Sequence, residues 1–311
     1  MAEIGIIIVT YNSESEIGPC LDAALPSGAE IVVVDNASRD SSVAEAVRRG
    51  VRVITNPINA GFAAAVNQGF AVLNSPYVLL LNPDARLQGS LQPLREACDL
   101  PRAAGAGGLL LDESGRPQVG FMVHALPTPA ALILEALVLN RLCPGNPVNR
   151  SYRALGLDYT STIAVEQPAG AFLMIRRSVW QQLGGMDEKF HPLWFDDVDF
   201  CRRAVDKGYI FYFHPAAVAK HTGGHSIPQL PVEMRRLYWY RSLLRYSAKH
   251  FRRPAFRAVC LAVITGSILR TVVESVQQRS LKPIAANGNI VRLAGRGFFF
   301  GWGERAGLSG S

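Results

Sequence analysis

Residues 4–38 read IGIIIVTYNSESEIGPCLDAALPSGAEIVVVDNAS. Two continuous apolar runs, at residues 4–10 and 29–35, flank a segment with helical spacing at residues 15–25. Unbroken apolar runs of this length are typical of parallel strands buried on both faces, and the segment between them can form a crossover helix. The stretch therefore predicts a right-handed βαβ unit at the start of the fold.

The same alternation continues as far as residue 82. It predicts a helix over 40–50 that ends at Gly50, a strand over 51–56, a helix over 61–74 and a strand over 77–82. This order favours an α/β fold with a mostly parallel sheet flanked by helices. In such sheets, ligands bind beyond the carboxyl ends of the strands, which here read TYN, DNAS, NPINAGF and NPDA.

The second part of the chain gives weaker patterns at first. The segment AGAGGLLLDESGRP predicts a strand and a turn at Ser114–Gly115, and residues 126–150 predict a loop with a short helix. Clearer signals follow residue 168, where we expect a strand, helices over 177–183 and 197–207, a strand over 209–215 and a loop over 220–226.

Composition and missing motifs exclude several classes of protein. The chain has 311 residues, 49% of them hydrophobic and 18% charged, which is typical of a globular protein. Its five cysteines lack CxxC spacing and are expected to be free thiols in a reducing cytosol. The start, MAEIGIIIVTYN, lacks the basic region of a signal peptide, so we expect a cytoplasmic protein. P-loop, GxGxxG, HExxH and GxSxG motifs are missing, which argues against common nucleotide hydrolases, dehydrogenases, zinc proteases and esterases.

One segment carries the positive charge of the chain. The net charge is +7, but residues 233–282 hold eleven Lys and Arg against two acids, so the other residues carry a net −2. We expect two helices here, broken at Pro254. In the second, an apolar stripe is formed by Leu261, Ile264, Ile268, Val272 and Val276.

These patterns divide the chain into two predicted domains. Residues 1–230 form the α/β domain, and residues 231–311 form a basic amphipathic helical extension whose Gly-rich tail, 295–311, is expected to be flexible. The stripe either contacts anionic lipid or packs on the α/β domain. The longest uncharged run there, Ala258–Leu269, is too short to span a bilayer.

Three acidic sites and one histidine are candidates for binding or catalysis, and the first two acidic sites follow strands of the predicted sheet. Asp35 follows the second strand, where its carboxylate can accept the N3–H of uracil or thymine, or form an Asx-turn or a helix cap. Asp84 follows the fourth strand and could hold a divalent cation, or belong to a proline-containing turn. His221, followed by glycines that let backbone N–H groups approach phosphate, could ligate a metal or contact a diphosphate, although a single histidine is usually structural.

The third acidic site lies in LWFDDVDFCRRAVDKG, residues 193–208. Asp196, Asp197 and Asp199 crowd together beside aromatic rings, which raises the pKa of carboxylates. In one interpretation these acids cap a helix and interact with its dipole. In the other, one of them is a general base for a hydroxyl.

Together these segments resemble the family 2 glycosyltransferases of the GT-A fold, in their rhamnosyltransferase-like branch. The matching pieces occur in the family's order over residues 4–226: IIIVTYNSE, IVVVDNASRDSS, NPINAGFAAAVNQGF, YVLLLNPDA, GAFLMIRRSVWQQLGGMDEKF, FDDVDFCRRAVDKGY and HPAAVAKHTGGHS. The resemblance implies inverting transfer of a sugar from a nucleoside diphosphate, with Mg²⁺ or Mn²⁺ as cofactor.

The resemblance also implies roles for single residues. Those expected to bind the nucleotide or the donor sugar are Thr10, Tyr11, Asn12, Asp35, Asn59, Gly61, Phe62, Asn67, Asn82 and Asp84. Asp84 matches the last acid of an Asp-x-Asp metal motif whose first position is Asn82 here, and His221 matches a histidine that completes the metal or diphosphate site.

The FDDVD element matches the family's Glu-Asp-x-Asp, which makes Asp197 the expected catalytic base. Asp196 and Asp199 are expected to bind the acceptor, and Trp194 to offer its ring to a sugar or to lie in the core. The expected donor is dTDP-rhamnose or a UDP-sugar. The expected acceptor is a glycan or polyprenyl-diphosphate-linked saccharide in cell-wall or surface-polysaccharide synthesis, and the protein is expected at the inner face of the cytoplasmic membrane.

Two other classes remain as alternatives. A sugar nucleotidyltransferase would need a basic Gly-rich loop after the first strand, where TYNSESE is acidic. A non-catalytic protein that binds lipid or nucleic acid through its basic segment would leave Asp35, Asp84 and Asp197 unexplained.

Overall fold

The computed structural model describes residues 2–223 and 230–302. The chain forms two compact units. The first, here called the sheet unit, comprises residues 1–126 and 153–229, and the second, the helical unit, comprises residues 127–152 and 230–311. The predicted division at residue 230 agrees with these units except for residues 127–152. This segment was assigned to the α/β domain, but it packs with the C-terminal helices.

The sheet unit is built on a nine-stranded sheet with the order β3-β2-β1-β4-β10-β6-β11-β5, in which β8 also pairs with β11. Its strands are β1 (Ile4–Thr10), β2 (Glu30–Asp35), β3 (Arg52–Thr55), β4 (Tyr77–Leu81), β5 (Ala85–Gln88), β6 (Ala103–Leu111), β8 (Ile163–Val165), β10 (Phe172–Arg176) and β11 (Ile210–His221). A second, two-stranded sheet pairs β7 (Val123–His124) with β9 (Gln167–Pro168).

The first four strands confirm the parallel βαβ prediction. β3, β2, β1 and β4 are parallel neighbours. The other half of the sheet is mixed, because β10 runs antiparallel between β4 and β6, and β5 and β8 run antiparallel to β11. The helices of this unit are α1 (Glu14–Ala24), α2 (Ser42–Arg48), α3 (Phe62–Val72), α4 (Gln92–Cys98), α8 (Arg177–Leu183) and α9 (Asp196–Asp206), with a short 3-10 helix at Leu25–Ser27.

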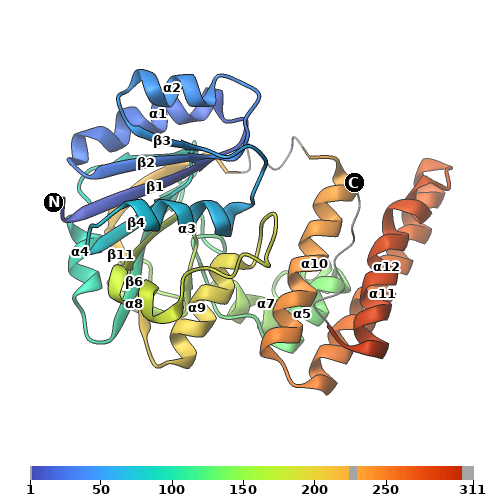
Figure 1. The fold of residues 1–311 in the computed structure, drawn as a ribbon. Helices are drawn as coiled ribbons and strands as arrows, with labels where there is room; N and C mark the ends of the chain where they lie inside the picture. Colours follow the sequence, from blue (N-terminus) through green and yellow to red (C-terminus); the bar gives the residue numbers. More distant parts are fainter. Residues whose placement is uncertain (1, 224–229, 303–311) are drawn as a thin grey trace. The chain divides into compact units, whose positions relative to one another are not determined.

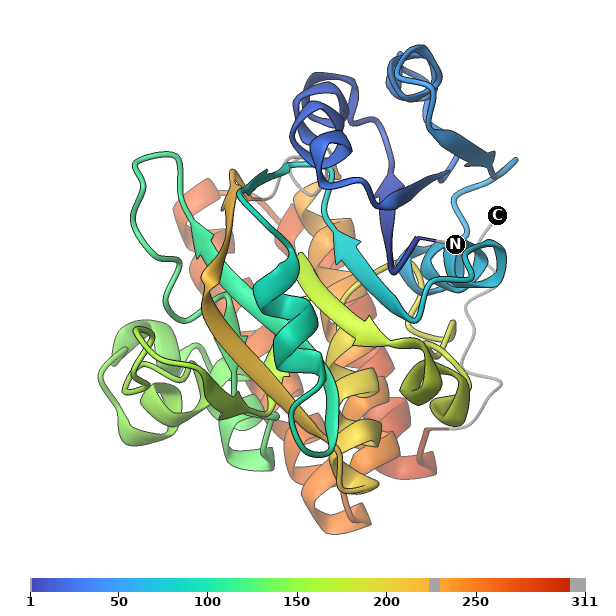
Figure 2. The same cartoon turned by 90° about the vertical axis from the view of Figure 1, so that its left-hand side faces the viewer.

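Helices cover both faces of the sheet. α1 and α2 lie on one side of β1–β3 and α3 lies on the other (Figure 1). α3 approaches β1 closely at Gly69, where a Cβ atom would lie 2.8 Å from the Ile7 side chain. Figure 2 shows α4 lying across the strands of the mixed half, with which it makes contacts at β6, β10 and β11. The strands β1, β2, β4 and β10 are therefore buried on both faces, as their unbroken apolar runs predict, whereas the edge strand β3 is not.

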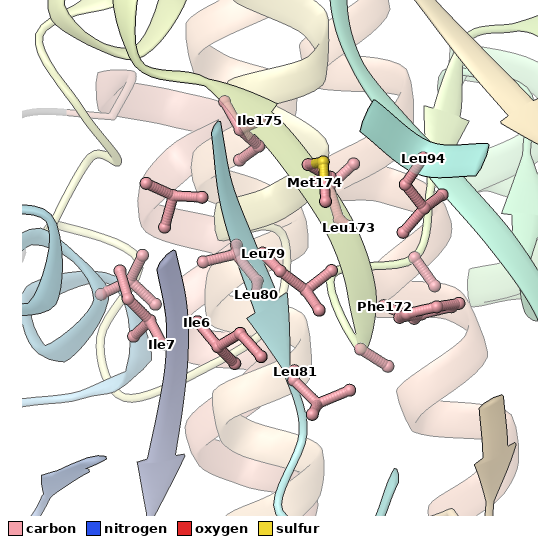
Figure 3. Packing of buried hydrophobic residues seen from close by; sticks show 14 of the residues in the cluster. Ile6, Ile7, Leu79, Leu80, Leu81, Leu94, Phe172, Leu173, Met174 and Ile175 are labelled. Atoms are coloured by element: carbon pink, nitrogen blue, oxygen red, sulfur yellow. The ribbon is translucent and has the colours of Figure 1, made fainter. Parts of the chain in front are cut away.

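The core of the sheet unit lies around the central strands. Side chains of β1, β4 and β10 pack together there, among them Ile6, Leu80 and Phe172 (Figure 3). Several of the buried residues come from sequence positions far apart, because β10 inserts between β4 and β6. This burial fixes the positions of the strand ends, which carry the polar residues described below.

The helical unit contains α5 (Pro129–Ala136), α6 (Leu139–Leu142), α7 (Pro147–Tyr152), α10 (Val232–His250), α11 (Arg253–Gln278) and α12 (Lys282–Phe300). The predicted break at Pro254 is confirmed, since α10 ends at His250 and Pro254 lies in the first turn of α11. α5 joins this unit because Gly266 of α11 lets the two helices touch: a Cβ there would lie 2.0 Å from the Ala136 carbonyl oxygen.

The expectation of a flexible tail from residue 295 is wrong for its first part. Residues 295–300 belong to α12, where Gly297 approaches Phe256 and Cys260 of α11 closely enough that a Cβ would lie 3.1 Å from the Phe256 ring. The rest of the expected tail from residue 303, and residues 224–226 of the expected loop 220–226, lie outside the described residues.

Candidate active site

The parallel strands bring their polar carboxyl ends to one edge of the sheet. β1 ends at Thr10 and β2 ends at Asp35, which are paired in register. The ladder continues past the strands, since the Asn36 N–H donates to the Thr10 carbonyl at 2.9 Å and the Asn56 N–H donates to the Asp35 carbonyl at 2.8 Å. The loops after β1, β2 and β3 therefore lie next to one another.

Asp35 is buried and held by three donors. Its Oδ1 accepts from the Thr10 hydroxyl at 2.7 Å and from the Ser38 hydroxyl, and its Oδ2 accepts from the Ser38 N–H at 2.9 Å. The contacts with Ser38, three residues on, are local bonds of the loop, related to the Asx-turn that the sequence allowed as an alternative. A carboxylate has about four acceptor positions, so one remains for a base N–H, and both interpretations are compatible with this geometry.

The loop after β1 is tied to the loop after β2. The Asn12 N–H donates to the Ser38 hydroxyl at 2.8 Å, and the Asn12 side-chain oxygen accepts from the Arg39 N–H at 2.9 Å. Tyr11, which precedes Asn12 in the loop after β1, is half-buried. Asn12 thus joins two loops of the expected nucleotide pocket, and its side-chain oxygen is already used in doing so.

The expected donor loop is fastened to the segment that precedes the acid cluster. Asn59 accepts from the Gly61 N–H at 3.0 Å, the Phe62 N–H donates to the Pro192 carbonyl at 2.9 Å, and a ring nitrogen of His191 lies 3.1 Å from the Asn59 carbonyl. Gly61 has φ +88°, and a Cβ there would lie 2.9 Å from the His191 ring. Glycine is required here for both reasons. The sequence reasoning missed His191 and Pro192, because their contact spans more than a hundred positions.

Asn67 is not placed to line a donor pocket. Its amide nitrogen donates to the Met186 carbonyl and its oxygen accepts from the Met186 N–H, both at 3.0 Å. The side chain ties α3 to the loop after α8, where the same amide nitrogen also reaches Glu188. The prediction of donor contact for Asn67 is not supported, because its polar atoms are used in this structural link.

Asp84 and His221 lie together although 137 positions separate them. β11 ends at His221, which pairs with Ala85 at the start of β5, and this pairing brings the imidazole beside Asp84. His221 Nε2 lies 3.4 Å from Asp84 Oδ1 and 3.4 Å from the Asn82 amide nitrogen. Both Asp84 and His221 are buried. The structure thus brings together the three residues that the metal motif implied.

Gln118 orients the histidine, and sequence reasoning did not find it. The Gln118 amide nitrogen donates to the His221 carbonyl at 2.8 Å, so its oxygen, 3.0 Å from Nδ1, is left as an acceptor for an Nδ1–H. Phe121 stacks on the imidazole at 5.1 Å. A donor at Nδ1 leaves the lone pair on Nε2, which faces Asp84. The only sequence signal was the position of Gln118 just after a predicted turn.

Asp84 and His221 could bind a divalent cation, to which the protein would supply few ligands. Among the described residues, no group of three or more His, Cys, Asp and Glu side chains could hold a metal ion. Asp84 Oδ1 and His221 Nε2 are close enough for one cation to bind both, and carboxylate oxygen with imidazole nitrogen is a ligand set that Mn²⁺ accepts. The replacement of an acid by Asn82 leaves this pair with one carboxylate.

The acid cluster forms the first turn of α9, but its three acids have different surroundings. Asp199 is fully buried and paired with Arg203 at 2.8 Å. Arg203 also donates to the carbonyls of Leu183 and Gly185, so the pair fastens α9 to the end of α8. The structure therefore does not support acceptor binding by Asp199, because its carboxylate is enclosed and neutralised.

Asp196 and Asp197 share the site unequally. Burial, helped by the neighbouring Asp197, raises the pKa of Asp196 to about 8, and burial also raises the pKa of Asp197. Asp196 accepts one bond from another residue's backbone, from the Asp197 N–H at 3.0 Å, and its Oδ2 is buried without a partner, whereas Asp197 accepts from the Val198 N–H at 2.8 Å and the Gly170 N–H at 3.0 Å. Backbone donors stabilise the ionised form. The more strongly raised pKa of Asp196 and the two backbone donors to Asp197 favour the proton of the pair on Asp196 and the negative charge on Asp197.

Asp197 and the Asp84–His221 pair are joined through two adjacent residues. Asp197 Oδ2 accepts from Gly170, and the next residue, Ala171, accepts from the Asn82 N–H at 3.0 Å through its carbonyl. Adjacent Cα atoms are about 3.8 Å apart. The expected base therefore lies at the same edge of the sheet as the expected metal ligands.

The residues before α9 have an uncommon backbone. Trp194 has φ +71° and Phe195 has φ +65°, in the left-handed region that bulky side chains rarely adopt. Such conformations persist where the surrounding structure imposes them, and they are frequent at functional sites. Phe195 is buried and Trp194 is half-buried, so a stacking role for the Trp194 ring stays a prediction.

Comparisons with known proteins agree with this description. The model of the family described as Glycosyl transferase family 2 matches residues 5–156. N-acetylglucosaminyl-diphospho-decaprenol L-rhamnosyltransferase of Mycobacterium tuberculosis (strain ATCC 25618 / H37Rv) is 29% identical over 248 residues, which cover 73% of this chain and 78% of that protein. The low-salt glycan biosynthesis hexosyltransferase Agl10 of Haloferax volcanii is 28% identical over 209 residues, covering 65% of this chain and 61% of its own.

Solved structures support the fold alone. The mannosyltransferase PcManGT from Pyrobaculum calidifontis, solved with GDP-Man and Mn²⁺, aligns with a TM-score of 0.54 at 15% identity over 96% of this chain and 87% of its own. GalNAc-T7, solved with UDP, GalNAc and Mn²⁺, aligns with a TM-score of 0.53 at 15% identity over 80% of this chain and 50% of its own.

The sheet has the GT-A fold, and the family match with the curated relatives makes the chain a glycosyltransferase. The relatives narrow that class further. The chain is similar to glycosyltransferase family 2 over residues 5–156, and to a mycobacterial rhamnosyltransferase over 73% of its length. The alternatives of a nucleotidyltransferase and of a non-catalytic binding protein are therefore dropped. Asp197 lies beyond the matched residues 5–156, so its role rests on the geometry above.

Proposed function

We propose that this enzyme transfers L-rhamnose from dTDP-rhamnose to a hydroxyl of a glycan or polyprenyl-diphosphate-linked saccharide, with inversion at the anomeric carbon. The observation that carries the proposal is the meeting of the Asp197 carboxylate with the Asp84–His221 pair at one edge of the sheet. A base and a site for the leaving diphosphate must face the same anomeric carbon from opposite sides in a single displacement.

Asp197 is the proposed base. Its carboxylate takes the proton of the acceptor hydroxyl while that oxygen forms a bond to the anomeric carbon. The bond from this carbon to the donor's diphosphate breaks in the same step, and the nucleoside diphosphate leaves with the electron pair. The Gly170 and Val198 N–H groups hold the carboxylate in place, and each oxygen keeps a lone pair for the incoming proton.

Asp84 and His221 are the residues that would hold a divalent cation, Mg²⁺ or Mn²⁺. Such a cation supplies neutralisation of the negative charge on the diphosphate. Gln118 fixes the imidazole so that Nε2 faces this site. Asp35 would accept the N3–H of thymine or uracil through its remaining acceptor position.

The choice of rhamnose and of a lipid-linked acceptor rests on a relative. The similar mycobacterial protein is named as an N-acetylglucosaminyl-diphospho-decaprenol L-rhamnosyltransferase. Its acceptor is a polyprenyl-linked sugar, which supports a role at the inner face of the cytoplasmic membrane and in cell-wall or surface-polysaccharide synthesis. Transfer of another sugar from a UDP donor is the second candidate, since Asp35 would accept the N3–H of either pyrimidine.

Thermal unfolding with dTDP, UDP, GDP and CDP, each with Mn²⁺ or with EDTA, tests the donor site. A ligand that binds only the folded protein raises the midpoint. We expect a shift with dTDP that needs the metal and is lost in Asp84→Ala. A shift with UDP alone would support the second candidate, and no shift with any nucleotide would contradict both.

Transfer itself is tested with dTDP-rhamnose and a polyprenyl-diphosphate-linked N-acetylglucosamine acceptor. The expected product carries rhamnose with inverted configuration, and Asp197→Asn should form it at least about 10²-fold more slowly. Unchanged binding of dTDP with this loss of rate would support the role of the base, whereas a variant as active as the unchanged protein would contradict it.

A further inference from the structure

Helix α11 has one face turned into the helical unit and one face turned to solvent. The inner face carries buried residues such as Phe256, Val259 and Val263, and packs against α5, α10 and α12. The outer face carries apolar side chains that are at least half exposed: Leu261, Ile268, Leu269, Val272, Val273 and Val276. The stripe expected from the sequence belongs largely to this exposed face.

The outer face forms one continuous arc. At 100° per residue, its six apolar residues span about 140° of the helix circumference. The charged residues in the same part of the helix point elsewhere: Arg270 lies over the Tyr240 ring, and Glu274 pairs with Arg236, so both turn toward α10. The arc is therefore free of charge from Ala258 to Gln278.

Cationic residues stand at both ends of the arc. Arg253 and Arg257 lie at its start, Arg279 and Lys282 at its end, and all four are exposed. From Arg257 to Arg279 the helix rises about 33 Å. Beyond the arc, Leu281 and Ile284 extend the exposed apolar surface past the end of α11. Such a surface is complementary to an anionic lipid layer. The apolar side chains match its acyl chains, and the cations match its negative headgroups.

We propose that the outer face of α11 lies flat on an anionic lipid bilayer, with its apolar side chains among the acyl chains and the terminal arginines and lysine on lipid phosphates. This inference deepens the proposed role at the membrane by naming the surface that attaches, and it rests on no step of transfer, so vesicle binding and sugar transfer can fail separately. It assigns four cations of residues 233–282, namely Arg253, Arg257, Arg279 and Lys282, to lipid headgroups.

A position in the plane of the membrane fits better than a spanning one. Among the described residues, α11 is the one helix long and apolar enough to cross a membrane by length and composition, which corrects the expectation drawn from the uncharged run Ala258–Leu269 alone. Its inner face, however, is occupied by other helices of the unit, and α12 carries exposed Arg292 and Arg296 alongside it. Drawing that neighbour into a bilayer would bury both charges, whereas a flat position leaves them in water.

Co-sedimentation of the full chain with phosphatidylcholine vesicles, with and without phosphatidylglycerol, tests the proposal. We expect binding to the anionic vesicles that weakens as salt is added. The double variant Leu269→Glu/Val276→Glu should lower the partition coefficient at least about tenfold, because it places two charges on the apolar arc. Both positions are exposed, so the fold should survive, as unchanged circular dichroism and nucleotide binding would show.

Gln278→Glu is the matched control. It adds a negative charge to an exposed position of the same helix, about 80° outside the arc. Binding should stay within about twofold of the unchanged protein. The proposal is overturned if the unchanged protein does not bind anionic vesicles, or if the double variant binds as well as the control.

A second copy of the chain is the other possible occupant, and the same variants separate the two. If the arc were a dimer interface, the unchanged protein would sediment as a dimer without lipid and the double variant as a monomer. That result would replace the lipid by a second copy and overturn the proposal. A monomer in both cases, with the difference confined to vesicle binding, supports it.

Discussion

The strand-end edge of the sheet unit and the outer face of α11 differ in how their side chains are held. At the edge, Asp35, Asp197 and His221 each have fixed hydrogen-bond partners. On the outer face of α11, the apolar side chains are exposed, and the residues by which the helix packs against its neighbours lie on the opposite side. A reaction centre needs oriented dipoles before the substrate arrives, whereas burial of apolar surface has no preferred direction. Changes at the edge should therefore alter rates and ligand binding, and changes on α11 should alter attachment or unit stability.

The largest effect expected is on catalysis. Asp197→Asn keeps the shape of the side chain and removes the base, so the rate of transfer should fall by about 10²–10⁴. The affinity for dTDP should hardly change, because Asp197 is assigned to the acceptor hydroxyl. A transfer assay with single-turnover kinetics, beside a thermal-shift titration of dTDP, measures both quantities.

The control for this change is Asp206→Asn, at the exposed end of the same helix, where Asp206 pairs with Arg202 at 2.9 Å. Exposed ion pairs of this kind stabilise by less than about 1 kcal/mol, so this variant should keep its activity. Equal losses in both variants would mean that α9 itself had been disturbed, and the assignment of the base would fail.

Asp196→Asn should change the pH dependence of stability. The folded protein raises the pKa of Asp196 from 3.8 to about 8, so the folded state binds the proton more tightly than the unfolded state. The stability that Asp196 contributes is therefore complete below about pH 4 and is lost as the pH rises to about 8. In the variant this loss should vanish, which amounts to a gain on the order of a few kcal/mol near pH 8.

Urea unfolding followed by fluorescence across this pH window measures the effect. Asp22→Asn is a useful comparison, because its hydrogen bond to Arg49 lowers the pKa of an exposed carboxyl. Stability linked to a lowered pKa is lost as the pH falls, so the two variants should differ in sign. If the free energy of unfolding of Asp196→Asn changed with pH as steeply as that of the unchanged protein, the raised pKa of Asp196 in the folded state would be contradicted.

Gly266→Ala tests the independence of the helical unit. Alanine is the better helix former by about 1 kcal/mol. Here its Cβ would lie 2.0 Å from the backbone oxygen of Ala136, which cannot turn aside. Overpacking of this kind costs about 1–3 kcal/mol, so the clash should outweigh the helix propensity.

Thermal unfolding followed by far-ultraviolet circular dichroism measures this loss, and dTDP binding reports on the sheet unit. Gly288→Ala in α12 is the control, since nothing lies near its Cβ position. It should be neutral or slightly stabilising. If Gly266→Ala lowered dTDP affinity as strongly as it lowered the stability, the two units would not act separately.

Much of the fold was predictable because its information is local. The apolar runs that form β1, β2 and β4 and the helical spacing between them give a parallel half-sheet from residues close in sequence. Two features were hidden because they depend on distant partners. β10 inserts antiparallel between β4 and β6, and α5 joins helices more than a hundred residues away through Gly266.

The same distinction holds for the site. Asp35, Asp84, His221 and Asp197 were predictable because each stands at the end of a strand or the start of a helix. Gln118 and Gly170 were not, because each acts by touching a residue that folding brings near. The predicted roles of Asn67 and Asp199 find no support in the structure for the converse reason: their residue types fit a ligand site, but Met186 and Arg203 contact their polar atoms.

The smallest effect expected belongs to Gln118, a positioning residue. Gln118→Leu removes the acceptor for the Nδ1–H of His221, so the imidazole can turn or change tautomer. Affinity for Mn²⁺ in the presence of dTDP should fall roughly tenfold, as is usual when the partner of a metal-binding histidine is lost. Gln118→Glu keeps an oxygen at this position and should retain most of the affinity. Nitrogen chemical shifts of the His221 ring report the tautomer without any metal. If the His221 ring kept its Nδ1 proton in Gln118→Leu, the pairing of β11 with β5 alone would orient the histidine. The side chains at the strand-end edge of the sheet unit would then be held by backbone pairing more than by side-chain partners.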